Sequence, residues 1–293
     1  NSLVNSICQR KIDVNKFLQK DLSNMCAPGK IYKKDLVKKY LDELNTEQMK
    51  NELINRGVHE KKITLVPNSC DPSRFCPRQP NTSLATKLNI PPGVPVIGYI
   101  GSFVQYEGLD MLVKAAVKLK NKGFEFRLLI VGDERVSANN SPVITEEINK
   151  IARDNNLNNL LIMTGRVSHE EVEEYYSLID IAPFPRKSQL VTELVSPIKP
   201  LEALAMEKAV VVSSVSALKD MVHDGITGLI FEKDNIDSLV DVLSRLINNS
   251  ELRKSLGKQG RLWIEKERTW SRTAGIIEKH FKLNSLNNCS NQA

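Results

Sequence analysis

The sequence has no apolar stretch long enough to cross a bilayer, and no signal peptide is recognisable at its start. Its four histidines are scattered, and its five cysteines have neither the even number of a disulfide framework nor the spacing of a metal-binding knuckle. These shortages argue against a metal site, a disulfide scaffold and a membrane-spanning protein. We therefore expect reduced thiols in a cytoplasmic protein, with peripheral contact at the inner face of the membrane as an open alternative.

The formal net charge is +6, yet the sequence has no long basic tract and no aromatic residues interleaved with basic ones. This charge balance favours anionic ligands or an anionic membrane surface and does not indicate nucleic acid. Hydrophobic residues make up 41% and charged residues 26%, as is ordinary for a soluble globular protein. A chain of 293 residues can form one large domain or two smaller ones.

From residue 62 onwards, short apolar runs alternate with segments of helical spacing. The runs are apolar throughout, which is typical of strands that are buried on both faces. Strands are predicted over residues 63–66, 94–100, 126–131, 160–163, 179–184, 209–212 and 229–231. Helices are predicted over residues 108–120, 144–153, 217–222, 236–247, 251–266 and 270–283, and after Ser168, where Glu171 would complete a capping box. The predicted fold class is α/β, a Rossmann-like parallel sheet flanked by helices.

Residues 1–60 have a different texture, because they are polar, rich in lysine and poor in strand signals. Apolar residues at helical spacing over residues 35–56 predict one helix, which Gly57 would end. The segment is too short and too polar to form a core of its own. The chain begins with Asn1, so we expect a processed product or a piece of a longer protein.

Four predicted strands end in small or turn-forming residues, namely Gly101, Gly132, Gly165 and Pro185. In open parallel sheets, ligands bind beyond the carboxyl ends of the strands. Each glycine alone could be only a turn residue. Their recurrence at successive strand ends predicts that the four ends line one cleft.

The stretch after the strand that ends at Pro185 carries the strongest signal for a ligand. Ser196 and Pro197 are predicted to begin a helix, because Ser is a favoured N-cap and Pro a favoured first residue. Its first turn would offer free N–H groups and Lys199 to a phosphate. Glu202 lies one turn further, where a carboxylate suits the hydroxyls of a ribose. A nucleoside diphosphate fits this pattern, and the alternative is a surface helix with an exposed Lys–Glu pair.

Six motifs follow one another in the sequence: VPNSCDPSRF at 66–75, GSFVQYEGLD at 101–110, VGD at 131–133, TGRVSHEEV at 164–172, SPIKPLEALAM at 196–206 and HDGITGLIF at 223–231. With them, residues 62–282 resemble the C-terminal, donor-binding domain of family 4 glycosyltransferases, which have the GT-B fold. The resemblance implies transfer of a sugar from a UDP- or GDP-sugar, with retention at the anomeric carbon, to a polysaccharide, glycolipid or similar acceptor. It implies no metal and no cofactor besides the donor substrate.

The resemblance also implies roles for single residues. Glu202 would bind the ribose, and Gly101 and Ser102 would form the turn at which the backbone approaches the phosphates. The segment Gly165, Arg166 and Val167 would border the base. Further donor-binding positions would be Gly132, Ser196, Pro200 and Leu201, and the candidate catalytic residues are Arg186, Lys199 and Glu193.

Three departures from the family pattern are visible. Where family members often carry Arg and Lys around the glycine turn, this chain has Ser102 and Glu107, and a carboxylate cannot hold a diphosphate directly. The positive charge must then come from Arg186, Lys187 or Lys199, and Arg186 is favoured over Lys187, which could be solvated. Eight residues, instead of the usual seven, separate Glu193 from Glu202. Glu193 could reach the sugar or be a solvated loop carboxylate, and the sequence leaves both open.

The third departure is that the N-terminal, acceptor-binding domain of this fold is not recognisable. Residues 1–61 are predicted to be a helical remnant of that domain and of the hinge, residues 62–268 the nucleotide-sugar-binding domain, and residues 269–293 a C-terminal helix and polar tail. A non-catalytic nucleotide-sugar-binding fragment is therefore the main alternative to a glycosyltransferase. A sugar-nucleotide epimerase of the same fold is disfavoured by the motif from Pro197 to Glu202.

Overall fold

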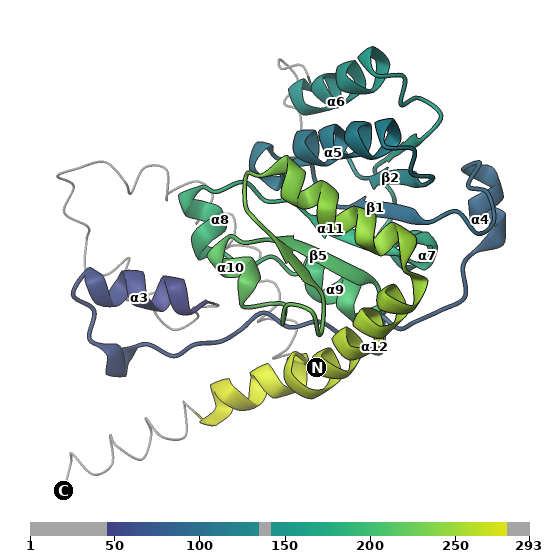
Figure 1. The fold of residues 1–293 in the computed structure, drawn as a ribbon. Helices are drawn as coiled ribbons and strands as arrows, with labels where there is room; N and C mark the ends of the chain where they lie inside the picture. The colour runs from purple at the N-terminus through teal and green to yellow at the C-terminus, as the bar shows by residue number, and fades with distance from the viewer. Residues whose placement is uncertain (1–45, 135–141, 280–293) are drawn as a thin grey trace, which may run out of the picture.

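The computed structural model describes residues 46–134 and 142–279, which form a six-stranded sheet covered by helices on both sides (Figure 1). All strand pairs are parallel, in the order β3-β2-β1-β4-β5-β6. The strands are β1 (Val96–Ile100), β2 (Arg127–Val131), β3 (Leu161–Gly165), β4 (Ile181–Phe184), β5 (Ala209–Ser213) and β6 (Leu229–Phe231). The predicted Rossmann-like α/β fold is thereby confirmed.

The helices are α3 (Glu47–Asn55), α4 (Thr82–Lys87), α5 (Leu109–Asn121), α6 (Val143–Asp154), α7 (Val172–Leu178), α8 (Leu190–Leu194), α9 (Lys199–Ala205), α10 (Ser216–Lys219), α11 (Ile236–Asn248) and α12 (Ser250–Glu267), with short 3-10 turns η1 (Glu60–Lys62) and η2 (Gln105–Glu107). Most of the helices flank the sheet, and α3 packs away from it against α8. Helix α5 packs against α6 and α11, and α9 packs against α12 (Figure 1). Residues 270–279 are also helical.

The order of the strands places a topological switch between β1 and β4. The chain passes from β1 to β2 and β3 on one side, and from β4 to β5 and β6 on the other. Successive right-handed crossovers in opposite directions put helices on opposite faces of the sheet. A crevice opens outside the carboxyl ends of the strands at such a switch point, which here lies between Gly101 and Pro185.

One predicted strand is wrong. Residues 63–66 do not join the sheet, although Ile63 and Val66 are buried. Ile63 instead packs with Met49 of α3 in a small second core, to which Leu65 and Val195 also contribute. A short apolar run does not by itself distinguish a strand from another buried segment.

Two helix starts also differ from the prediction by more than one residue. Helix α7 begins at Val172, after a turn in which the Glu171 carboxylate accepts hydrogen bonds from the Ser168 backbone N–H and hydroxyl. Helix α9 begins at Lys199, with Ile198 as N-cap, so Ser196 is not the cap and Pro197 is not the first helical residue. The Ser196 carbonyl and hydroxyl are bonded to Asn68 instead, which holds the loop outside the helix.

The N-terminal helix α3 lies against the loop between α8 and α9. Gly57 follows the end of α3 with φ +88°, as predicted, and residues 35–45 of the predicted helix lie outside the described residues. Thr46 caps α3 and also donates a hydrogen bond to the Leu194 carbonyl at 2.5 Å. In the described ranges, no helix combines the length and the apolar character that a membrane span requires. The predicted domain boundaries stay a prediction.

Candidate functional site

The ends of β1, β2 and β3 come together in backbone-to-backbone contact. The Gly132 N–H donates to the Gly165 carbonyl at 2.9 Å, and the Gly101 N–H donates to the Val131 carbonyl at 2.9 Å. A Cβ on Gly132 would lie 1.9 Å from the Gly101 oxygen, so only glycine fits there. Gly165 has φ +72°, and nothing lies within 4 Å of where its Cβ would be. The carboxyl ends of these three strands therefore lie together and are lined by glycines, with open space beside Gly165.

Next to these strand ends lie the residues predicted to border a base. Arg166 is exposed and forms a 3.3 Å ion pair with Asp133, which follows β2. Val167 is partly buried and packs against the main core. The side chain of Arg166 thus spans from the end of β3 to the end of β2.

Across the switch point, Arg186 forms a buried ion pair with Glu107. The guanidinium donates to the carboxylate through Nη2 at 2.7 Å and Nε at 3.4 Å, and the two side chains are 9% and 4% exposed. Arg186 Nη1 also donates to the Val195 carbonyl at 3.0 Å, and the guanidinium lies over the Tyr106 ring. The predicted catalytic cation is therefore bound to the carboxylate that had looked like a departure from the family pattern.

Lys199 extends from α9 to the Gly101 turn. A Cβ on Gly101 would lie 2.2 Å from Lys199 Nζ, so the ammonium stands directly against this backbone. Lys199 Nζ lies 3.0 Å from the Tyr99 hydroxyl, which in turn donates to the Ser102 carbonyl at 3.2 Å. Its distance to Glu107 Oε1 is 4.0 Å. The structure thus brings Gly101, Ser102 and Lys199 together.

The charges in this cluster influence each other strongly. Burial lowers the pKa of Lys199, and Arg186 lowers it further, whereas Glu107 and Glu202 raise it. Burial alone would raise the pKa of Glu107, but Arg186 and Lys199 outweigh burial and lower it. Glu107 is thus held as a carboxylate among two cations.

Glu202 lies one turn further along α9, partly buried, and accepts a hydrogen bond from the Tyr176 hydroxyl at 3.4 Å. Burial raises the pKa of Glu202 to about 7, although Lys199 and Arg74 oppose the shift. The alternative of an exposed Lys–Glu pair is wrong, because Lys199 is only 26% exposed and the two side chains contact different tyrosines. A carboxylate that is poorly hydrated gains more from hydroxyl donors than an exposed one does.

The other predicted positions on this stretch are occupied within the chain. Pro200 and Leu201 are buried, and the Leu201 N–H donates to the Ile198 carbonyl at 2.9 Å. Ser196 is buried and bonded to Asn68. These residues form the loop before α9 and its first turn, and they are buried. The positive charge of the site comes from side chains more than from the helix terminus.

Glu193 and Lys187 have partners outside this cluster. The Glu193 carboxylate accepts hydrogen bonds from Lys233, from Ser188 and from the backbone and hydroxyl of Ser216. Burial would raise the pKa of Glu193, but these hydrogen bonds together lower it to about 2. The contacts favour a structural role, and a catalytic role for Glu193 stays a prediction. Lys187 is not solvated, because it pairs with Asp110 at 2.7 Å.

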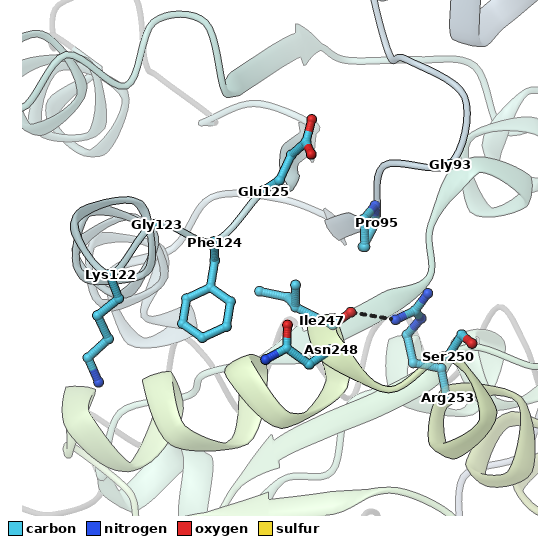
Figure 2. Close-up of a pocket in the computed structure, with 10 residues that line it drawn as sticks. All are labelled: Gly93, Pro95, Lys122, Gly123, Phe124, Glu125, Ile247, Asn248, Ser250 and Arg253. Carbon is cyan, nitrogen blue, oxygen red and sulfur yellow. Dashed lines mark hydrogen bonds between the residues drawn. The ribbon is translucent and has the colours of Figure 1, made fainter.

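Two hollows lie elsewhere. One of about 530 Å³ lies where β1 and β2 begin, at the opposite edge of the sheet, and Figure 2 shows the side chains around it. Arg253 in this hollow already donates to the Leu246 and Ile247 carbonyls. The other, of about 480 Å³, lies beside α7 and includes Arg74, His169 and Glu173. Within the described part of the chain, no group of acidic, His or Cys side chains could hold a metal ion.

Sequence reasoning missed three members of the site. Tyr99 lies inside an apolar strand, and nothing in its pattern marks the hydroxyl that meets Lys199. Tyr176 was hidden in the same way within α7. Glu107 was noticed only as a departure from the family pattern, and its buried ion pair with Arg186 was not predicted.

Glycines, two cations and a carboxylate lie at the switch point of this parallel sheet, which is where doubly wound α/β domains bind their ligands. The family model of glycosyl transferases group 1 matches residues 81–263, more than half of the chain. The chain therefore belongs to the group 1 glycosyl transferases.

Two relatives illustrate the match, and one solved structure illustrates the likeness of fold. An uncharacterized glycosyltransferase of Methanocaldococcus jannaschii is 29% identical over 63% of this chain and 47% of its own length. A lipopolysaccharide 1,2-N-acetylglucosaminetransferase of Salmonella typhimurium is 24% identical over 78% of this chain and 59% of its own length. The solved structure of Anabaena HepE with UDP and glucose superposes with a TM-score of 0.72, at 14% identity, over 86% of this chain and 65% of HepE. The chain thus spans about half the length of these two curated relatives.

Proposed function

We propose that the carboxyl ends of the strands, around the switch point between β1 and β4, bind the nucleoside diphosphate part of a UDP- or GDP-sugar. The observation that carries the proposal is the position of Lys199, whose ammonium stands against the Gly101 backbone at the switch point. Backbone without side chains permits close approach of a diphosphate, and a cation beside it balances the charge. Glu202 lies one turn along the same helix, where its carboxylate can accept hydrogen bonds from ribose hydroxyls.

The roles follow from the contacts. Lys199 binds the diphosphate, and Arg186 adds positive charge from behind, since its guanidinium is already bonded to Glu107 and to Val195. Glu202 accepts hydrogen bonds from the ribose. The open side of Gly165, with Arg166 and Val167, borders the base. The neighbour HepE, which has the same fold, was solved with UDP, and this supports a nucleotide in the equivalent crevice.

The reaction is a transfer of the sugar to an acceptor hydroxyl. The bond between the anomeric carbon and the β-phosphate oxygen breaks, a bond to the acceptor oxygen forms, and the acceptor proton passes to the departing phosphate. Charge grows on the phosphate as an oxocarbenium-like state develops on the sugar. Lys199 and Arg186 stabilise that growing charge without a metal ion.

Retention at the anomeric carbon and membership of family 4 belong to this proposal, as does an acceptor of the polysaccharide or glycolipid type. The name of the Salmonella relative, which acts on lipopolysaccharide, supports such an acceptor. We propose the domain division of the sequence as well, with residues 62–268 as the donor-binding domain. The hydroxyl of Ser69, near the start of this domain, lies 2.6 Å from the hydroxyl of Thr273, which follows the domain, and both are buried, so the C-terminal helical stretch packs against the first residues of the domain.

Calorimetry with UDP and GDP tests the donor site on this chain. We expect one of the two to bind, and to bind more tightly than its nucleoside. Failure of both to bind at millimolar concentration, with a protein that unfolds cooperatively, would refute the donor site. An assay of turnover of a nucleotide sugar, with NMR of the product's anomeric configuration, then tests transfer and retention.

A further inference from the structure

Glu107 occupies a position at which a negative charge should repel a diphosphate. The backbone explains why it cannot turn away. A Cβ on Gly108 would lie 1.9 Å from the Pro185 carbonyl, and the Lys187 N–H donates to the Tyr106 carbonyl at 2.9 Å. The short turn η2 is therefore pressed against the residues that follow β4. This contact places the Glu107 carboxylate directly beside Arg186.

The carboxylate of Glu107 faces two cations that belong to separate elements. It accepts two hydrogen bonds from Arg186, which follows β4, and lies 4.0 Å from Lys199 Nζ on α9. The other ionisable groups that face Lys199 are the Tyr99 hydroxyl on β1 and the Glu202 carboxylate on its own helix. Asp110, which lies one turn beyond Glu107, pairs with Lys187, which follows Arg186.

The two cations need an anion between them. Arg186 and Lys199 both lie in a part of the site that excludes most water, and like charges repel strongly there. A lysine in such surroundings loses its proton readily, whereas an arginine does not. Of the groups around Lys199, Glu107 is the one that contacts both cations.

We propose that Glu107 is a positioning residue for the donor, one that binds Arg186 and Lys199 together and keeps Lys199 charged against the Gly101 backbone. It acts through the two cations and does not touch the diphosphate. Arg186 and Lys199 supply the positive charge on the far side of the switch point, and Glu107 is the counter-charge that this arrangement requires. The inference rests on the proposed donor site.

Substitution Glu107→Gln tests the proposal, with the ratio of UDP to uridine affinity measured by calorimetry from pH 8 to pH 10.5 (GDP and guanosine, if the wild type binds GDP). In this range Glu202 and the phosphates are ionised, and titration of the base cancels in the ratio. In the wild type the ratio should fall as Lys199 loses its proton, at a midpoint that serves as the reference. In Glu107→Gln the ratio should fall at least about one pH unit lower, so that the UDP affinity is reduced by a factor that approaches tenfold above both midpoints, while the uridine affinity is unchanged.

Two further variants make the result specific. Asp110→Asn removes a neighbouring carboxylate that serves Lys187 and Lys114, and it should leave the midpoint of the ratio where the wild type has it. Lys199→Met should abolish the pH dependence, because it removes the titrating group. A midpoint in Glu107→Gln that equals the wild-type midpoint would overturn the proposal.

Loss of Glu107 leaves a buried arginine unpaired, so the single variant could fail to fold. The double variant Glu107→Gln, Arg186→Met removes both charges and serves in that case. Lys199 then lacks both the anion that raises its pKa and a cation that lowers it. Because the effect of Glu107 on this pKa is larger than that of Arg186, the midpoint should lie below the wild-type value. An unchanged midpoint in the double variant would overturn the proposal equally. If the wild type binds neither UDP nor GDP, the donor site itself is refuted, which is a different outcome.

Discussion

The side-chain amide of Asn68 lies 2.7 Å from the carbonyl oxygen of Ser196 and 3.1 Å from its hydroxyl, although 128 residues separate the two in sequence. The two preceding carbonyls of this loop are held in the same manner. Thr46 donates to Leu194, and Arg186 donates to Val195. Three successive carbonyls before α9 are thus bound by side chains, two of them from segments more than 100 residues away in sequence. The position of Lys199 and Glu202 consequently depends on the residues that lead into the domain.

The loop contacts predict the effect of Asn68→Ala. The Ser196 carbonyl is left without its donor in a buried site, and the free energy of unfolding should fall by about 1–3 kcal/mol. Because the start of α9 then shifts, both uridine and UDP should bind more weakly. Urea unfolding and calorimetry measure the two effects.

Asn81→Ala is a matched control for Asn68→Ala. Asn81 caps α4, away from this loop, by accepting from the Leu84 N–H at 2.9 Å. Its loss should cost about 0.5–2 kcal/mol of stability and leave uridine and UDP binding unchanged. Equal weakening of binding in both variants would mean that Asn68 acts only through general stability.

The raised pKa of Glu202 predicts a pH dependence of stability. The group titrates near its ordinary value of 4.5 in the unfolded chain and at about 7 in the folded protein. The folded state therefore keeps a proton that the unfolded state releases, and Glu202 makes stability fall as the pH rises from 4.5 to 7. The fall amounts to about 3 kcal/mol at 1.4 kcal/mol per pH unit.

Glu202→Gln isolates this contribution. Urea unfolding without nucleotide, at pH 5 and pH 8, should show a smaller fall in stability for the variant than for the wild type. Uridine binding by the wild type should strengthen about tenfold between pH 6 and pH 8, as the carboxylate ionises, and the variant should lack this change. A wild-type uridine affinity that is independent of pH would contradict the assignment of Glu202 to the ribose.

The close contact of the glycine-lined strand ends predicts the effect of Gly132→Ala. The added methyl would lie 1.9 Å from the Gly101 oxygen, and φ is +130° at this position. We expect a loss of about 2 kcal/mol or more in the free energy of unfolding. Gly275→Ala is the contrasting variant, since Gly275 lies in the helical stretch 270–279 with nothing within 4 Å of its Cβ position. It should be neutral or stabilise the protein by up to about 1 kcal/mol.

The sequence predicted the elements of the sheet better than the contacts of the site. Strand β6 has the predicted bounds, and most other strands shift by one or two residues, because a continuous apolar run is a local property. The start of α9 was misplaced because Asn68 and Thr46 hold the preceding loop, and neither contact has a local signal. The pairing of Glu107 with Arg186, 79 residues apart, depends on the strand order, which spacing alone does not give.

Glu193 yields a prediction of a different kind. Its carboxylate is tied to Lys233, Ser188 and Ser216, and its pKa is about 2, so its contribution to stability is present above pH 4.5 and is lost as the pH falls towards 2. Glu193→Gln should lower the free energy of unfolding at pH 7 and change UDP affinity by less than about twofold. If the variant instead keeps its stability and loses turnover of a nucleotide sugar, Glu193 is catalytic.

The central claim is that Lys199, which binds the diphosphate, and Glu202, which binds the ribose, lie one helical turn apart on α9. Uridine and UDP affinities (or guanosine and GDP, if GDP binds), measured by calorimetry for Lys199→Met and Glu202→Gln, test it most directly. Glu202→Gln should weaken nucleoside and nucleotide alike, about ten- to a hundredfold, because a hydrogen bond to a charged group contributes about 1.5–3 kcal/mol. Lys199→Met should weaken UDP and leave uridine nearly unchanged. Equal losses of uridine and UDP affinity in Lys199→Met would contradict the phosphate assignment, and with it the proposed orientation of the donor.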